Sequence, residues 1–174
     1  MTTSDNTSAR PAASAPVMPG RISGGMSMAI GSLPYLDVGD AVAAALAATD
    51  IVTIPTTPRR SPAEGMLAQA LIGIQGVSIS ALGTILVDPL KVTAGAAVTT
   101  DLGHDAFATM RAFLDAGPQF SGPVKWQFVG PVTLGLALQR AGVRASVAFE
   151  VAAHAVRSHV EHLLTAVAAA LPGS

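Results

Sequence analysis

The sequence contains no cysteine among its 174 residues. This absence excludes disulfide bridges, thiolate zinc sites, iron–sulfur clusters and a cysteine nucleophile. Any metal site within the chain would have to be built from His, Asp or Glu. Charged residues are also few, at 12% of the chain, and the net charge is −1. We therefore expect no nucleic-acid partner and no polybasic membrane anchor, and a small molecule is the more plausible ligand.

The N-terminal region is rich in Ser, Thr, Ala and Pro and lacks the apolar core of a signal peptide. We predict a disordered tail over residues 1–24, a single domain over 25–174 and a cytoplasmic location. The run 66–87 has no charged residue and is long enough to cross a bilayer. Its glutamines, serines and glycines favour a soluble helix followed by a hairpin, so we expect no membrane span.

Short apolar runs alternate with helical patterns along the rest of the chain. Residues 26–30, 51–54 and 124–129 have the composition of strands buried on both faces. Helices are predicted over 38–48, 62–72, 101–116, 133–140 and 146–171, with Asp37 and Thr100 as N-caps. Residues 77–87 contain a Leu-Gly pair between two β-branched stretches, which predicts a small hairpin. Strands separated by helices imply parallel βαβ units, in either an open doubly wound sheet or a (β/α) barrel.

Three motifs, in order, resemble those of the superfamily that holds cobalamin-independent methionine synthase and uroporphyrinogen decarboxylase. Ile30-Gly31-Ser32 followed by Leu33-Pro34 resembles the signature of the first barrel strand in methionine synthases. The arginine-containing turn 58–62, with Glu-Gly-Met at 64–66, resembles the turn after the second strand. Residues 127–134 resemble the Gly-Pro-Val-Thr-Leu end of a later strand. The resemblance covers roughly residues 26–140.

The resemblance implies a fold and an activity. The fold would be a partial (β/α) barrel of the TIM type, with about three βα units, an inserted hairpin and a site at the C-terminal ends of the strands. Complete barrels of this type have about 250 residues, so the chain would correspond to the N-terminal portion of one. The activity would be methyl transfer to a thiol such as homocysteine, incomplete in this chain alone. Zinc in that family is bound by His, Cys, Glu and Cys, and these ligands are absent here, so we expect no metal or other cofactor within the chain.

Candidate ligand-binding residues follow from the three motifs. The resemblance places Ile30, Gly31 and Ser32 where methionine synthases grip the amino-acid end of their substrate. Physically, a glycine lets backbone N–H groups approach a carboxylate, and a serine adds a hydroxyl. The alternative is a strand-ending turn with no ligand. Catalytic residues are not identifiable from the sequence.

The other two motifs supply further candidates. Arginine side chains in the Pro-rich turn could bind a carboxylate through a forked hydrogen bond. The alternative is one solvated arginine and one paired with Glu64. Residues that flank the Gly-Pro corner could orient a substrate, or simply begin a helix. The candidates in these two motifs are Arg59, Arg60, Gln127 and Thr133.

Histidines on the last predicted helix do not indicate a metal site. His154, His159 and His162 lie among charged residues at i, i+4 spacing, such as Glu150 with His154. We interpret this side of the helix as a solvated face.

Two other functions are compatible with the sequence. The first is a non-catalytic half-barrel that binds a small carboxylate, with its free strand edges covered by a second copy or a partner chain. The second is a decarboxylase of the uroporphyrinogen type, which is suggested only by shared fold and the arginine turn.

Overall fold

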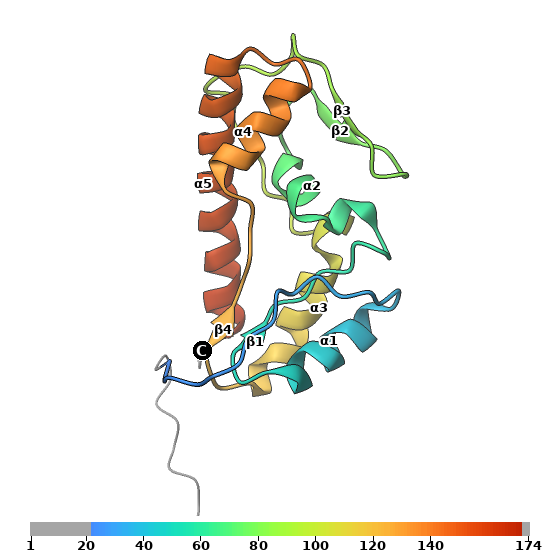
Figure 1. Cartoon of the computed structure of the whole chain (residues 1–174), viewed down its shortest axis with the longest axis vertical. Helices are drawn as coiled ribbons and strands as arrows, with labels where there is room; N and C mark the ends of the chain where they lie inside the picture. Colours follow the sequence, from blue (N-terminus) through green and yellow to red (C-terminus); the bar gives the residue numbers. More distant parts are fainter. Residues whose placement is uncertain (1–21, 172–174) are drawn as a thin grey trace, which may run out of the picture.

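The computed structural model describes residues 22–171 (Figure 1). Most of the predicted tail, at 1–21, therefore lies outside the described residues, as do 172–174. The chain contains both α-helices and short β-strands. The α-helices are α1 (Val38–Ala48), α2 (Met66–Leu71), α3 (Ala108–Ala116), α4 (Pro131–Arg140) and α5 (Ala145–Ala170), with short 3-10 turns η1 (Pro62–Glu64), η2 (Asp105–Phe107) and η3 (Gly117–Gln119).

The parallel part of the structure is small. Strands β1 (Val52–Thr53) and β4 (Val124–Lys125) pair in parallel, with Thr53 opposite Lys125. The segment 28–32 lies beside β1 and joins it only through two isolated parallel bridges, Met28 with Ile51 and Ser32 with Thr56. The two partners of the second bridge lie one residue further apart in the sequence than the two partners of the first. The pairing therefore changes register between the bridges, and no continuous ladder forms.

The predicted partial barrel is wrong. Within residues 22–171 the strands form only two sheets of two strands each, and neither sheet curves into a barrel wall. The physical reason lies in the length of the parallel segments. Gly31 and Pro55 interrupt the first two after a few residues, and β4 has only two residues in ladder pairing. Of the predicted βα units, only short parallel pairings remain, between the segment 28–32, β1 and β4.

The predicted hairpin is present. Strands β2 (Val77–Ile79) and β3 (Ile85–Val87) pair antiparallel, with Ser78 opposite Leu86. Gly83, at φ +81°, occupies the turn, where its N–H donates to the carbonyl of Ser80 at 2.9 Å. A glycine suits this position because residues with a side chain rarely adopt positive φ.

Two predicted helices differ from their expected bounds. The helix expected over 62–72 is divided into η1 and α2 at Gly65, whose backbone is extended. The helix expected from 101 begins only at Ala108, after η2. Thr100 does not cap it, because its hydroxyl contacts His159 instead at 2.9 Å. By contrast, Asp37 caps α1 as predicted, and its side chain accepts from the N–H of Asp40.

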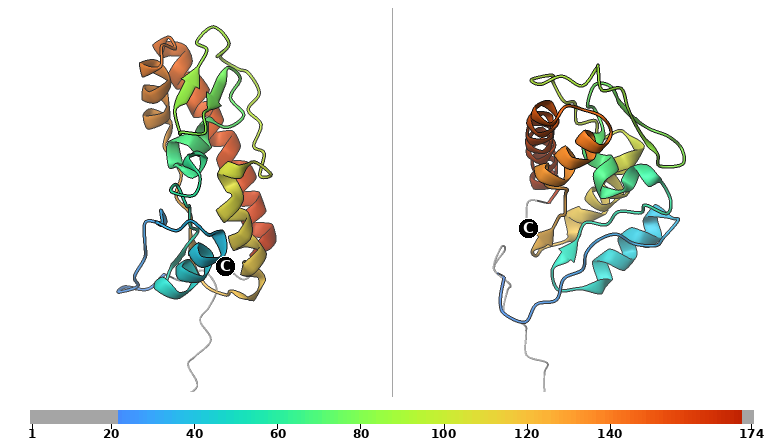
Figure 2. Two further views of the ribbon diagram at one scale, coloured as in Figure 1. Left: turned by 90° about the vertical axis from the view of Figure 1, so that its right-hand side faces the viewer. Right: turned by 45° about the horizontal axis from the view of Figure 1, so that its top comes forward.

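Helix α5 runs along the length of the molecule and connects two apolar cores (Figures 1 and 2). In the first core its N-terminal half packs with α4, α2 and the hairpin. In the second its C-terminal end packs with α3, α1 and β1. Phe128, which follows β4, contacts both cores. The largest fully buried side chains of the two cores are Leu71, Leu134 and Leu138 in the first, and Phe107, Phe113, Leu163 and Leu171 in the second.

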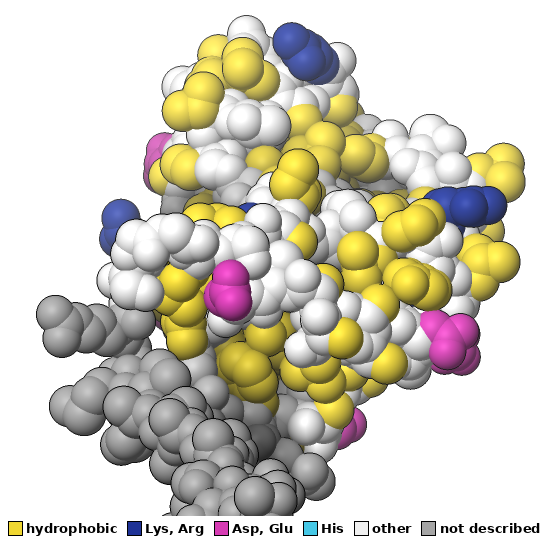
Figure 3. All heavy atoms as spheres, turned by 60° about the horizontal axis from the view of Figure 1, so that its bottom comes forward, with side chains coloured by type: hydrophobic (Ala, Val, Ile, Leu, Met, Phe, Trp, Pro, Cys, Tyr) yellow, Lys and Arg dark blue, Asp and Glu magenta, His cyan; other side chains and the backbone are white. Residues whose placement is uncertain are grey.

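One face of the molecule exposes many apolar side chains. Figure 3 shows this face, on which charged side chains are few. The segment before α1 contributes several of the exposed large apolar residues of the protein: Ile22, Met28, Ile30, Tyr35 and Leu36. In the region from residue 22 to 171, no helix is both long enough and apolar enough to cross a membrane.

Candidate functional site

Four of the seven predicted site residues line one small hollow. Ile30, Gly31 and Ser32 come from the segment beside β1, and Gln127 comes from the chain just after β4. The hollow measures about 10 Å³, room for about one water molecule. The other residues that line it are Ile54, Thr56, Met66 and Gln69.

Gly31 is required by the backbone at this corner. Its φ is +107°, and a Cβ atom here would lie 2.8 Å from Cγ2 of Thr53 and 3.1 Å from the carbonyl oxygen of Ile54. Its own carbonyl accepts a hydrogen bond from the N–H of Thr56 at 2.9 Å. The next residue, Ser32, places its hydroxyl 3.4 Å from that of Thr56. The corner is thus held tightly against the segment after β1, and Ser32 remains exposed beside it.

Lys125 adds a charge to this corner, where the four predicted residues that line the hollow are uncharged. Its Nζ donates to the carbonyl of Ala29 at 2.7 Å and to Oε1 of Gln127 at 3.2 Å. Oε1 accepts from the ammonium, and the amide nitrogen of Gln127 donates to Sδ of Met66, another residue of the hollow, at 4.0 Å. A signal for Lys125 was present in the sequence. It is the only charged residue in 124–129 and shares the period-2 face of Gln127.

Gln69 is a second residue that sequence reasoning missed. It lies on α2, is 3% exposed, and donates from Nε2 to the carbonyl of Ala106 at 2.7 Å. This bond fixes the orientation of the amide at the wall of the hollow. A glutamine within an apolar helix gives little indication of its tertiary partner, so the sequence offered no usable signal.

The arginine turn has a structural part in this chain. Arg59 is exposed and lines none of the cavities described below. Arg60 donates from Nη2 to Oε1 of Glu64 at 2.6 Å and from Nη1 to Oδ1 of Asp105 at 2.9 Å. The structure thus has the alternative arrangement, with one exposed arginine and one paired with Glu64.

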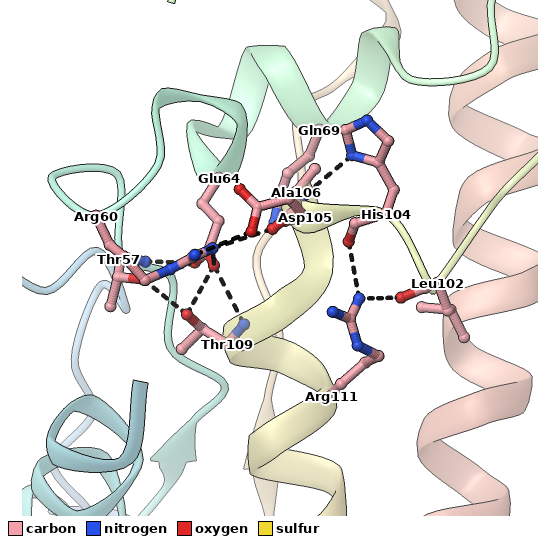
Figure 4. A network of polar contacts seen from close by, with 10 residues as sticks. All are labelled: Thr57, Arg60, Glu64, Gln69, Leu102, His104, Asp105, Ala106, Thr109 and Arg111. Atoms are coloured by element: carbon pink, nitrogen blue, oxygen red, sulfur yellow. Dashed lines mark hydrogen bonds and ion pairs between the residues drawn. The ribbon is translucent and has the colours of Figure 1, made fainter. Parts of the chain in front are cut away.

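Glu64 is the centre of the buried polar network in Figure 4. Oε2 accepts from the N–H and the hydroxyl of Thr57, at 2.6 and 3.0 Å. Oε1 accepts from Arg60 and from the N–H and hydroxyl of Thr109, at 3.2 and 2.8 Å. The two threonine hydroxyls also lie 2.7 Å apart. Two hydroxyl protons cannot serve three contacts at once, so one hydroxyl donates to the other and the second donates to the carboxylate.

The network joins the Pro-rich turn to the start of α3. The Ser61 hydroxyl and the Arg60 guanidinium lower the pKa of Asp105 below its ordinary value. Arg111 on α3 donates to the carbonyls of Leu102 and His104, which fixes the loop before η2. These contacts order the turn from within, and none of them leaves a group of Glu64 directed at solvent.

Thr133 and Trp126 lie away from the hollow. Thr133 is exposed in the first turn of α4, where it does not line the hollow. Trp126 packs against the second core and stacks near Phe128, with ring centroids 5.0 Å apart. Alternation along the chain after β4 therefore directs Trp126 and Gln127 to different sides.

The protein also has larger cavities than the hollow. One, of about 460 Å³, is bounded by η1, the end of α2 and β2, and includes Ser78, His104 and Asp105. In it Nδ1 of His104 accepts from the N–H of Ala106 at 3.0 Å, so neutral His104 carries its proton on Nε2. Another cavity, of about 310 Å³, is mainly apolar and lies between α1 and the segment 29–35, with Gly31 at its border.

His159 is buried, contrary to the predicted solvated face. Its side chain is 0% exposed, its ring lies edge-on to Phe128, and Nδ1 contacts the Thr100 hydroxyl. Within the described residues Nε2 has no hydrogen-bond partner. Burial lowers the pKa of His159, and the nearby carbonyls of Ile72 and Ala70 offset this only in part.

Metal ligands do not gather in the described structure. Across residues 22–171, no three His, Asp or Glu side chains lie close enough together to hold an ion. Comparison of the chain with protein-family models, with curated proteins and with solved structures finds no match.

Proposed function

We propose that this chain is a methionine-synthase-like protein that binds the amino-acid end of a small thiol or thioether, such as homocysteine or methionine, for methyl transfer to the thiol. One observation supports the proposal above all. Residues from the first and the last of the three motifs, Ile30 to Ser32 and Gln127, line the same hollow. The resemblance assigns the first of these motifs to that end of the substrate.

The hollow offers hydrogen bonds of the type that an amino-acid end group needs. Ser32 supplies an exposed hydroxyl, and Gln127 supplies an amide nitrogen that is oriented by Lys125. The volume of about 10 Å³ admits one water-sized group, such as a single carboxylate oxygen, so the rest of the ligand would lie over exposed Ile30. The residues that line the hollow are all uncharged at neutral pH. Their part in the proposed function is to bind and orient the substrate, and they contain no group suited to move a proton.

Zinc activates the thiol in the methionine synthases that the chain resembles. The residues of this chain do not fit that ion. There is no cysteine in the sequence, and the described residues contain no cluster of metal-binding side chains. We therefore assign no step of methyl transfer to groups of this chain and restrict the proposal to substrate binding within that reaction.

Binding without catalysis is the second candidate. The uncharged lining of the hollow favours it, because no histidine or carboxylate that could act as a base lines the site. A decarboxylase of the uroporphyrinogen type has less support. Arg60, which the arginine turn would use to hold substrate carboxylates, already pairs with Glu64 and Asp105.

Isothermal titration calorimetry with L-homocysteine and L-methionine tests the proposal. We expect both to bind to the wild type and Ser32→Ala to weaken binding about fivefold or more, through loss of one hydrogen bond. Ser78→Ala, an exposed serine on β2, is the matched control and should bind as the wild type does. Absence of heat with both ligands would remove the proposal. Binding of either ligand together with no methylated product, when a methyl donor is supplied, would favour the non-catalytic function.

A further inference from the structure

Among residues 22–171, Lys125 is a half-buried cation without an anionic partner. The ion pairs of the described residues are Arg60 with Glu64, Arg60 with Asp105, and Lys91 with Asp88. The Nζ atom of Lys125 instead contacts two uncharged oxygens, the carbonyl of Ala29 and Oε1 of Gln127. Ammonium groups withdrawn from solvent are normally paired with an anion, because neutral acceptors compensate only part of their lost hydration.

The position of this cation connects it with the hollow. Gln127 lines the hollow, and its Oε1 lies 3.2 Å from Nζ. Ala29, whose carbonyl accepts at 2.7 Å, directly precedes Ile30 and Gly31 of the hollow. An ammonium has three protons, and these two contacts use two of them. One donor therefore remains beside a site whose own lining has no charge.

We infer that the ammonium of Lys125 binds the carboxylate of the ligand that enters the hollow. This inference rests on the proposed function, and it names the group that recognises the acid end of the substrate. The ligand class is a small α-amino acid or another compact carboxylate. Its carboxylate would accept from Nζ of Lys125 and from Nε2 of Gln127, which the same lysine orients.

The two arginines that the sequence offered for this task are placed differently. Arg60 is held by Glu64 and Asp105, so binding a ligand would require breaking two ion pairs. Arg59 is exposed on the turn and does not line the hollow. The cation that adjoins the hollow through direct hydrogen bonds is Lys125.

A comparison of two ligands and three variants tests the inference. Methioninamide has an uncharged carboxamide in place of the carboxylate of methionine and keeps the same side chain. We expect the wild type to bind methionine at least about tenfold more tightly than methioninamide, as for a hydrogen bond to a charged group. Lys125→Met should remove this preference and Lys125→Arg should keep part of it. Lys91→Met, at an exposed lysine, is the control and should retain the full preference.

A second measurement, made on the wild type alone, tests the inference even if neither methionine nor homocysteine binds. The ¹⁵N shift of the Lys125 ammonium is followed while sodium acetate is added, with sodium chloride at equal ionic strength as reference. A saturable shift with acetate only would support a carboxylate site at Lys125, even if neither methionine nor homocysteine binds. Failure of the two amino acids to bind would then count against the proposed function and not against this inference. An unchanged preference for methionine in Lys125→Met, or equal shifts with acetate and chloride, would overturn the inference.

Discussion

Lys125 on β4 and Ala29 are joined by a hydrogen bond of 2.7 Å that spans 96 positions of sequence. The same carbonyl of Ala29 also accepts from the hydroxyl of Thr53 on β1, at 3.1 Å. Two side chains, one from β1 and one from β4, thus bind the segment 28–32 in addition to its interrupted backbone pairing with β1. The corner that begins at Ile30 is positioned by these side-chain bonds as well as by the sheet.

Gly31→Ala should disrupt the corner. The positive φ and the contact of 2.8 Å to Cγ2 of Thr53 leave no room for a methyl group. We expect a loss of more than about 1 kcal/mol in the free energy of unfolding, together with loss of methionine binding. Urea denaturation and calorimetry measure the two effects. Gly24→Ala is the control, because no atom lies within 4 Å of the added methyl there, and it should change neither.

Glu64→Ala should strongly destabilise the fold. The substitution leaves Arg60 without its buried partner and removes the acceptor of both threonine N–H groups. We expect a loss of about 3–5 kcal/mol, typical of removing one member of a buried ion pair. Chemical denaturation gives the value, and Glu150→Ala on the exposed side of α5 should stay within about 0.5 kcal/mol of the wild type. A small effect at Glu64 would contradict the structural part given to this network.

Stability should decrease as the pH falls below about 6.5, through His159. Burial lowers the pKa of His159 from 6.5, so the unfolded chain binds more protons than the folded chain in this range. The stabilisation is therefore complete above the unfolded pKa and declines as the pH falls below it. Unfolding free energies at pH 7.5 and 5.5 measure the decline.

Two histidine variants separate this contribution from other titrations. His159→Phe should reduce the difference in stability between pH 7.5 and 5.5, because it removes the buried titrating group. His154→Gln, at an exposed position of α5, should leave that difference unchanged. Within residues 22–171, the charge that affects the pKa of His159 is that of His162, which lowers it further. An equal pH dependence in all three proteins would contradict the assignment.

The outer edge of the segment 28–32 should support self-association. Among the described strands none pairs with this edge, and Met28 and Ile30 are 59% and 71% exposed. Unpaired apolar edges promote pairing between chains, and a charged side chain opposes it. We expect light scattering to show a dimer of the wild type, and Met28→Lys to shift it toward monomer. Leu82→Lys, at the exposed hairpin turn, should not, and a monomeric wild type would contradict the prediction.

Local patterns predicted much of the secondary structure. Asp37 at the start of α1 and the Leu82-Gly83 pair of the hairpin each act within a few residues, and each appears as expected. The parallel order of the three apolar runs is also present, as short pairings. The barrel was wrong because sheet closure depends on contacts between distant segments, which strand composition does not determine.

The residues of the candidate site were predictable only where local sequence motifs place them. The Gly31 corner and Gln127 follow from motifs at strand ends, and they meet at one hollow. Arg60 and His159 illustrate the limit of sequence reasoning. Each has a local environment that suggests solvent or ligand, and each is instead engaged by a partner far along the chain, Asp105 and Thr100 respectively. A single sequence does not indicate which distant residue a polar side chain contacts in the folded protein.

Chemical-shift mapping with unlabelled L-methionine and ¹⁵N-labelled protein tests the central claim most directly. If the ligand binds at the corner, the backbone amides of Gly31 and Ser32 and the side-chain amide of Gln127 shift with one common affinity. Signals from the larger cavity, such as those of Ser78 and His104, remain in place. Saturable shifts confined to that larger cavity, or no saturable shift at all, would contradict the proposed site.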